Sequence, residues 1–88
     1  MNISRRASAG TMESSDAYIE IEPASELSIH LESVVKKQFG DKIESAVREV
    51  LSDCGVESAI VRVTDRGALE CVIRARVETA VKRSGGGS

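Results

Sequence analysis

The sequence predicts a small α+β domain in which two β-hairpins form a sheet and helices pack against it. Several short segments have an apolar residue at every second position, a pattern typical of strands with one buried face. One longer segment repeats apolar residues every three or four positions, which is typical of an amphipathic helix. With 88 residues, of which 41% are hydrophobic and 30% charged, the chain suits one folded domain with a modest core. The expected order is strand-strand-helix-strand-strand-helix.

Two alternating segments follow one another closely after residue 16. Their apolar positions are Ala17, Ile19 and Ile21 in the first segment and Leu27, Ile29 and Leu31 in the second. Pro23 lies between the segments and ends the first strand because it lacks a backbone N–H. The two strands are therefore predicted to form a hairpin joined near residues 23–26. This arrangement places His30, the only histidine, on the polar face.

The helical segment follows this hairpin. Apolar residues recur at helical spacing at Val35, Phe39, Ile43, Ala46, Val47, Val50 and Leu51. Ser33 or Asp41 is the expected N-cap, depending on whether Gly40 interrupts the helix, and Gly55 is a suitable C-terminal stop.

The last third predicts a second hairpin and a short terminal helix. Val61 and Val63 precede a turn at residues 64–67, and alternation resumes at Leu69, Cys71, Ile73 and Ala75. A helix is expected from about Arg76. The spacing of Leu69, Val72, Ile73 and Val77 also fits a helix that begins earlier, so two alternatives stay open here.

The two ends of the chain lack such patterns. Residues 1–15 are polar and small and are predicted to be a flexible leader, whereas residues 16–83 are expected to form the single domain. Residues 84–88, S-G-G-G-S, resemble a flexible tail or an artificial linker.

Charge and composition exclude several classes of partner. The net charge is −2, which gives no reason to expect nucleic acid or an anionic membrane as partner, and no segment is long and apolar enough to span a membrane. We expect a cytoplasmic protein. No Lys or Arg lies between Ala7 and Val35, where six carboxylates occur. These carboxylates are either solvated strand residues or an acidic docking surface for a basic partner.

No arrangement of residues suggests an enzyme or a metal centre. His30 is distant in sequence from the serines of the leader, and neither a phosphate-binding glycine loop nor paired metal carboxylates occur. Cys54 and Cys71 lack the spacing of metal ligands and are expected to be buried thiols. An exposed serine in the polar leader is nevertheless accessible to modification by another enzyme.

Three blocks of sequence carry a resemblance to a known family. They are A-G-T-M-E-S-S-D at residues 9–16, K-K-Q-F-G-D-K-I at residues 36–43 and D-R-G-A-L-E-C-V-I-R-A-R-V-E at residues 65–78. In order and spacing they closely resemble the acyl carrier protein, or gamma subunit, of citrate lyase. In that family the serine of the A-G-T-x-E-S block carries the prosthetic group, and the matching residue is Ser14. The family pattern often has glycine at the next position, where this chain has Ser15.

The resemblance implies a non-catalytic carrier with a covalent cofactor. Ser14 would carry 2'-(5''-phosphoribosyl)-3'-dephospho-CoA through a phosphodiester, as O-(phosphoribosyl dephospho-coenzyme A)serine. The thiol of this arm would hold acetyl and citryl thioesters while citrate is cleaved to acetate and oxaloacetate. The implied partners are the alpha subunit (acyl transferase), the beta subunit (citryl lyase) and a prosthetic-group transferase. Two alternatives remain, a malonate decarboxylase-type carrier and a protein-interaction module that carries no group.

Overall fold

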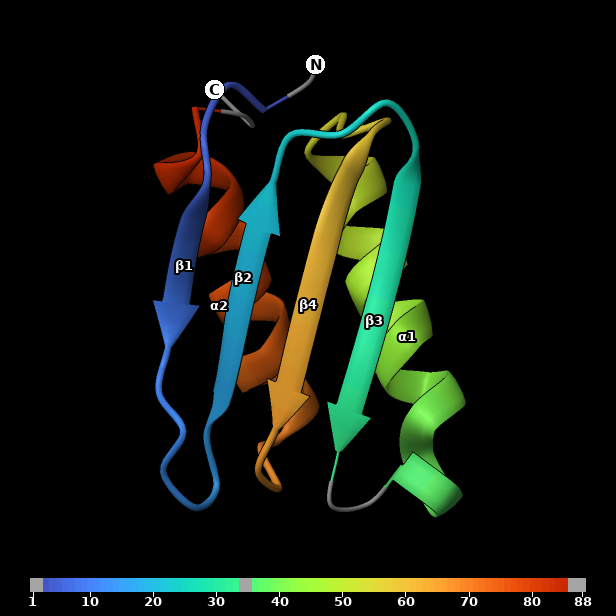
Figure 1. Cartoon of the computed structure of the whole chain (residues 1–88). Helices are drawn as coiled ribbons and strands as arrows, with labels where there is room; N and C mark the ends of the chain where they lie inside the picture. Colours follow the sequence, from blue (N-terminus) through green and yellow to red (C-terminus); the bar gives the residue numbers. More distant parts are fainter. Residues whose placement is uncertain (1–2, 34–35, 86–88) are drawn as a thin grey trace.

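The chain folds into one sheet with two helices on one of its faces (Figure 1). The computed structural model describes residues 3–33 and 36–85, except for the side chains of residues 36–39. The elements are β1 (Ala7–Gly10), β2 (Ala17–Glu22), β3 (Leu27–Ser33), α1 (Lys36–Asp53), β4 (Ala59–Asp65) and α2 (Glu70–Arg83). The four-stranded sheet has the order β1-β2-β4-β3. The predicted α+β class, with helices packed on a sheet, is confirmed.

The predicted pairing of β2 with β3 is wrong, because β4 lies between them. β2 runs antiparallel to both β1 and β4, whereas β3 runs parallel to β4. β3, α1 and β4 thus form a β-α-β unit, in which the helix connects two parallel strands. In this register Val61 of β4 lies between Ile21 of β2 and Ile29 of β3. Alternation identified β2, β3 and β4 but carried no information about which strands are neighbours in the sheet.

The predicted strand that begins at Leu69 is also wrong. Residues 70–83 form a single helix, so the open alternative of an earlier helix start is the correct one. Ile73, Val77, Ala80 and Val81 are buried at helical spacing. Cys71, which the predicted strand would have placed on its buried face, is exposed. α2 packs against β1, β2 and α1 through this buried side (Figure 1).

The first and last segments have more structure than expected. Ala7–Gly10 pairs with β2 as an edge strand, and Ile3 and Ala9 are buried, so the prediction of a flexible leader over residues 1–15 is wrong for this part. Ser84 is buried as well, and its carbonyl oxygen accepts hydrogen bonds from the N–H groups of Ser4 and Arg5 at 2.9 and 3.1 Å. Residues 1–2 and 86–88, which belong to the predicted leader and tail, lie outside the described residues.

α1 runs through Gly40 without interruption. Asp41 is therefore an interior helical residue, and Ser33 is the last residue of β3. At the other end the left-handed φ of 75° at Gly55 terminates the helix as predicted, and Val56 N–H donates to the carbonyl oxygen of Leu51. Of the predicted apolar face, Val35 and the side chain of Phe39 lie outside the described part.

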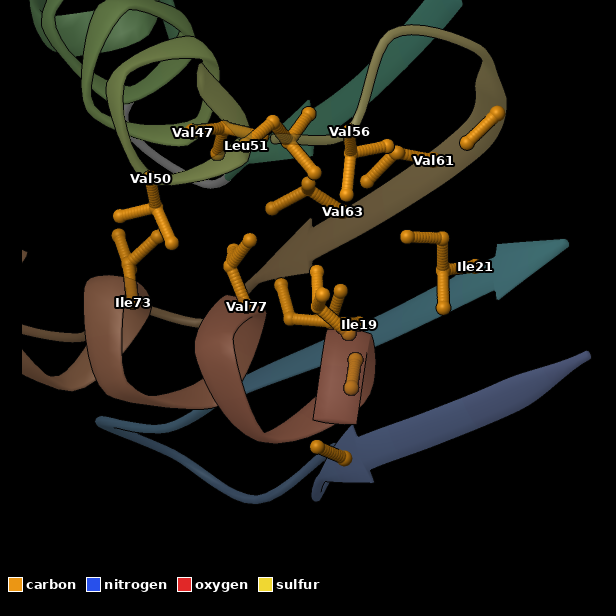
Figure 2. Packing of buried hydrophobic residues seen from close by; sticks show 14 of the residues in the cluster. Ile19, Ile21, Val47, Val50, Leu51, Val56, Val61, Val63, Ile73 and Val77 are labelled. Carbon is orange, nitrogen blue, oxygen red and sulfur yellow. The ribbon is translucent and has the colours of Figure 1, made fainter. Parts of the chain in front are cut away.

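The core is aliphatic and lies between the sheet and the helices. Figure 2 shows Ile19, Ile21, Val61 and Val63 of the sheet packed against side chains of α1 and α2 such as Leu51 and Val77. The other face of the sheet carries the polar strand residues and is covered by no helix of the described chain (Figure 1). Neither described helix is both long and apolar enough to span a lipid bilayer.

Candidate functional site

Ser14 lies in the connection between β1 and β2. We call residues 11–16 the serine loop. It is located at the same end of the sheet as the turn between β4 and α2, and opposite the start of β1 and the end of α2 (Figure 1). Residues 11–15 of the loop are exposed. The loop is therefore presented to solvent beyond the edge of the core.

The entry to the serine loop requires a glycine. Gly10 has a φ of +93°, a left-handed conformation that L side chains rarely adopt. A Cβ at this position would lie 1.8 Å from the carbonyl oxygen of Ala17 and 3.3 Å from Cδ of Arg76. The glycine of the A-G-T block therefore lets the two strands and α2 approach one another closely where the loop begins.

Asp16 organises the exit of the serine loop. Its carboxylate accepts hydrogen bonds from the Thr11 hydroxyl and from the Ala17 N–H, each at 2.7 Å. Arg76 of α2 donates through Nε and Nη2 to the two carboxylate oxygens, each at 3.2 Å. The Thr11 hydroxyl, followed by the Ala17 N–H and Arg76, holds the pKa of the Asp16 carboxyl below its ordinary value. The side chain is thus an ionised acceptor with partners on both ends of the loop and on a helix.

Backbone hydrogen bonds join the loop to the turn that follows β4. Ser15 N–H donates to the carbonyl oxygen of Arg66 at 2.8 Å, and Arg66 N–H donates to the carbonyl oxygen of Asp16 at 2.9 Å. Within the loop, Glu13 N–H donates to the Thr11 hydroxyl at 3.2 Å. The serine loop is therefore exposed but held by specific hydrogen bonds, in contrast to the flexible leader that the sequence predicted.

Ser14 and Ser15 differ in conformation and in bonding. The Ser14 hydroxyl is exposed and makes no hydrogen bond with any residue that the structure describes. Ser15 has a left-handed φ of 66°, and its N–H is used in the bond to Arg66. A free, exposed hydroxyl is the arrangement that modification by another enzyme requires. Both serines have such a hydroxyl among the described residues, so Ser14 differs from Ser15 in its backbone and in its place in the A-G-T-M-E-S block.

A second carboxylate shapes the neighbouring turn. Asp65, at the end of β4, is buried and accepts hydrogen bonds from the N–H groups of Gly67 and Ala68 at 3.1 and 2.8 Å. It also accepts a bond from the Ser33 hydroxyl at 2.7 Å. Ala17 is paired with Asp65 in the sheet, so the two aspartates fix adjacent connections at this end of the molecule.

Sequence reasoning singled out Ser14 as a candidate but did not connect it with Asp16 and Arg76, which hold the end of its loop. These two residues are 60 positions apart, and no local pattern connects them. His30 lies far from the loop in sequence, in the middle of β3, with its Nε2 2.9 Å from the Ser28 hydroxyl on the same strand.

The cysteines do not contribute to this site. Cys54 is half-buried and Cys71 is exposed, so the expectation of two buried thiols is wrong for Cys71. Burial, with the nearby Glu78 and Asp53 carboxylates, raises the pKa of the Cys54 thiol. No three His, Cys, Asp or Glu side chains in residues 3–33 and 36–85 form a group that could hold a metal ion.

Comparison with known proteins identifies the family. The chain matches the family model ACP, described as malonate decarboxylase delta subunit (MdcD), over residues 4–84. It is 55% identical over 86 residues to citrate lyase acyl carrier protein 2 of Salmonella paratyphi A, covering 96% of this chain and 89% of that protein. It is 50% identical over 84 residues to citrate lyase acyl carrier protein of Haemophilus influenzae, covering 96% of this chain and 88% of that protein.

Solved structures agree on the fold. A chain of the Pseudomonas malonate decarboxylase hetero-tetramer in complex with malonate superimposes with a TM-score of 0.78 at 24% identity, over 97% of this chain and 93% of that chain. At this identity the similarity establishes the fold alone. The family match and the two curated relatives cover nearly the whole chain, including the serine loop, and the chain therefore belongs to the family of acyl carrier proteins that serve citrate lyase and malonate decarboxylase.

Proposed function

We propose that this chain is the acyl carrier subunit of citrate lyase and that Ser14 is its point of covalent modification. The observation that carries the proposal is the exposed Ser14 hydroxyl, free of hydrogen bonds to described residues, within a loop whose ends are fixed by Gly10 and Asp16. The identity of 55% to a citrate lyase acyl carrier protein favours citrate lyase as the complex that this chain serves.

The residues around Ser14 fit a prosthetic group attached through a phosphodiester. A phosphodiester is a permanent anion, so it needs an exposed oxygen and suffers no burial penalty when its site is open to water. The Ser14 side chain meets that requirement, and the adjoining turn carries the exposed cation Arg66. The proposed group is 2'-(5''-phosphoribosyl)-3'-dephospho-CoA, and when bound it supplies a thiol whose thioester activates an acyl group for transfer and for carbon–carbon cleavage.

The contribution of this chain is to hold and present the group. Ser14 Oγ would form the bond to phosphorus and give its proton to a base of the transferase, while the P–O–P bond of an activated phosphoanhydride donor would break and release the remaining phosphate or pyrophosphate. The serine loop then determines where the attached group leaves the protein surface. Because attachment converts encounters with the partner subunits into intramolecular ones, it raises the effective concentration of the acyl group. No chemical step in this scheme requires an acid or base from the chain itself.

The proposed partners follow from this role. They are the alpha subunit, an acyl transferase, the beta subunit, a citryl lyase, and the transferase that attaches the group. Together the subunits would cleave citrate to acetate and oxaloacetate, and we expect the complex to be cytoplasmic. Since the serine loop lies at one end of the molecule, the attached group would extend from that end toward the active sites of both catalytic subunits (Figure 1).

Intact mass spectrometry of the chain purified with its complex tests the proposal. The mass should exceed that of the bare chain by one phosphoribosyl-dephospho-CoA group, and peptide mapping should place the group on Ser14. Ser14→Ala should abolish attachment and citrate cleavage, and the matched variant Ser15→Ala should retain both. An unmodified chain in an active complex would exclude the carrier role in favour of an interaction module.

One alternative carrier role has support of its own. The matching family model is described by the malonate decarboxylase delta subunit, and the fold is that of a chain in a malonate decarboxylase complex. A reconstituted complex distinguishes the two roles by its substrate. Activity on malonate without activity on citrate would assign the chain to malonate decarboxylase.

A further inference from the structure

Arg76 of α2 contacts the exit of the serine loop and passes close to its entry. At the exit its guanidinium donates two hydrogen bonds, each 3.2 Å long, to the two carboxylate oxygens of Asp16. At the entry its Cδ lies 3.3 Å from the position that a Cβ on Gly10 would occupy. Arg76 lies near the middle of α2, whose neighbouring residue Val77 is fully buried, so its own backbone is firmly anchored. Both ends of the serine loop therefore lie close to the same residue of α2.

The geometry of this contact is specific. Asp16 is only 15% exposed through its side chain, and Arg76 is 41% exposed. A planar guanidinium that donates through two nitrogens fixes the orientation of the carboxylate as well as its distance. The Thr11 hydroxyl binds the same carboxylate from the first residue of the loop. Asp16 therefore joins three segments, namely the start of the loop, its end and α2.

Energetic considerations indicate a role other than stability. Partly exposed ion pairs contribute about 0–1 kcal/mol to folding, and six other ion pairs among the described residues are of this exposed kind. Of all the ion pairs in the described part of the chain, only Arg76–Asp16 reaches the serine loop. Its main effect is then on the conformations available to residues 11–16.

We propose that Arg76 and Asp16 are positioning residues that hold the serine loop in the one conformation in which Ser14 is accepted by the prosthetic-group transferase. This inference rests on the proposed function, which supplies the transferase as partner. In a loop without this support, only a fraction of molecules present Ser14 correctly. The apparent affinity of an enzyme for its substrate falls in proportion to that fraction. The effect therefore acts on the KM for the carrier, while kcat for bound molecules is preserved.

Attachment kinetics with matched variants test this role. The substrates are the full chain and the activated donor, with purified transferase, and product is quantified by intact mass. Arg76→Met removes the guanidinium but keeps an unbranched side chain, and we expect the KM for the carrier to rise about tenfold with kcat within about twofold. Arg74→Met is the control, because Arg74 is on the same helix and pairs with Glu49 and Glu70, away from the loop. This control should leave KM unchanged.

A second measurement is independent of the transferase. Amide hydrogen exchange reports opening of the Ser15 and Asp16 N–H groups, which are bonded to Arg66 and Glu13 within this structure. We expect exchange at both amides to become about tenfold faster in Arg76→Met and to stay unchanged in Arg74→Met. Arg76→Lys keeps the charge but cannot donate from two nitrogens of a planar group. Its KM for the carrier should therefore stay close to that of Arg76→Met. Asp16→Asn serves as a second probe if Arg76→Met fails to fold.

The outcomes separate this inference from the proposed function. If the unaltered chain accepts no group, or accepts it at another residue, the proposed function fails. If the unaltered chain is modified at Ser14 and Arg76→Met shows the same KM and the same loop exchange, only the positioning role is overturned. A loss of thermal stability in Arg76→Met with unchanged KM would assign the ion pair to folding and also overturn the positioning role.

Discussion

A Cβ added to Gly10 would lie 1.8 Å from the carbonyl oxygen of Ala17, a separation that no side chain can occupy. Gly10 also has a φ of +93°. Gly10→Ala must therefore move backbone and adopt a left-handed conformation, and we expect it to lower the free energy of unfolding by about 2–5 kcal/mol. Urea unfolding monitored by circular dichroism measures the loss.

Gly67→Ala is the matched control for that prediction. Gly67 has nearly the same φ, +91°, but a Cβ there would have no atom within 4 Å. Only the backbone conformation is then unfavourable, at a cost of about 1–2 kcal/mol. Equal losses in the two variants would show that close approach at Gly10 does not matter.

Ser15→Gly should make the chain more stable. Ser15 has a φ of 66°, in the region that glycine adopts without a steric penalty. We expect the free energy of unfolding to rise by about 0.5–1 kcal/mol. This value includes the opposing effect of the larger backbone entropy of glycine in the unfolded chain. Attachment at Ser14 should be unaffected. A destabilised variant, measured by thermal unfolding, would contradict this explanation of the glycine that the family often has here.

The sequence predicted strands where side chains alternate strongly and failed where they do not. Alternation of large aliphatic residues located β2, β3 and β4, and helical spacing located α1. β1 was missed because its sequence, A-S-A-G, has only small residues, and it is held by pairing with β2 and by packing under α2. α2 was ambiguous because Ile73 fits both periods. The folded chain decides between them, since residues 70–83 are helical and Cys71 is exposed.

The sequence also predicted one part of the candidate site and not another. Ser14 could be singled out from its sequence block, because the block is contiguous. The residues that support the loop could not be predicted, because Arg76 is 60 residues away from Asp16 and reaches it only after α2 has packed on β1 and β2. The predicted flexibility of the loop followed from its polar composition, whereas its hydrogen bonds depend on the turn after β4.

Asp65→Ala should be strongly destabilising although no charge partner is lost. The carboxylate is 1% exposed and accepts hydrogen bonds from the N–H groups of Gly67 and Ala68 and from the Ser33 hydroxyl. Its removal leaves the half-buried N–H of Ala68 and the more exposed N–H of Gly67 without this acceptor, at a cost of about 2–3 kcal/mol. Asp65→Asn retains the acceptor Oδ1 and should cost about 1 kcal/mol. Chemical denaturation measures the free energy of unfolding of both variants. Equal losses in the two variants would show that these hydrogen bonds are not the cause of the destabilisation.

Charge reversal of Glu20 and Glu22 to Lys should weaken assembly with the partner subunits while leaving attachment at Ser14 intact. These carboxylates lie on the uncovered face of the sheet, where Glu20 pairs with Arg6 and Glu22 with Arg62. The pairs are exposed, so their loss should cost less than about 1 kcal/mol each in stability. Reversal of Glu44 and Glu78, on α1 and α2, is the control with the same change in net charge. Unchanged assembly in a pull-down with the partner subunits would show that this face is not a docking surface.

The stability contributed by Asp16 should depend on pH only in the acidic range. Its carboxyl pKa is lowered in the folded chain by Thr11, Ala17 and Arg76 from an ordinary value of 3.8. Because the folded chain binds this proton less readily than the unfolded chain, the contribution is complete above about pH 4 and is lost as the pH falls through the folded pKa. The difference in free energy of unfolding between the unaltered chain and Asp16→Asn should therefore be constant from pH 7 to pH 5 and should shrink below pH 4. Using the difference cancels the titration of the other carboxylates. Urea unfolding at a series of pH values measures it, and a decline between pH 7 and pH 5 would show that another group controls the loop.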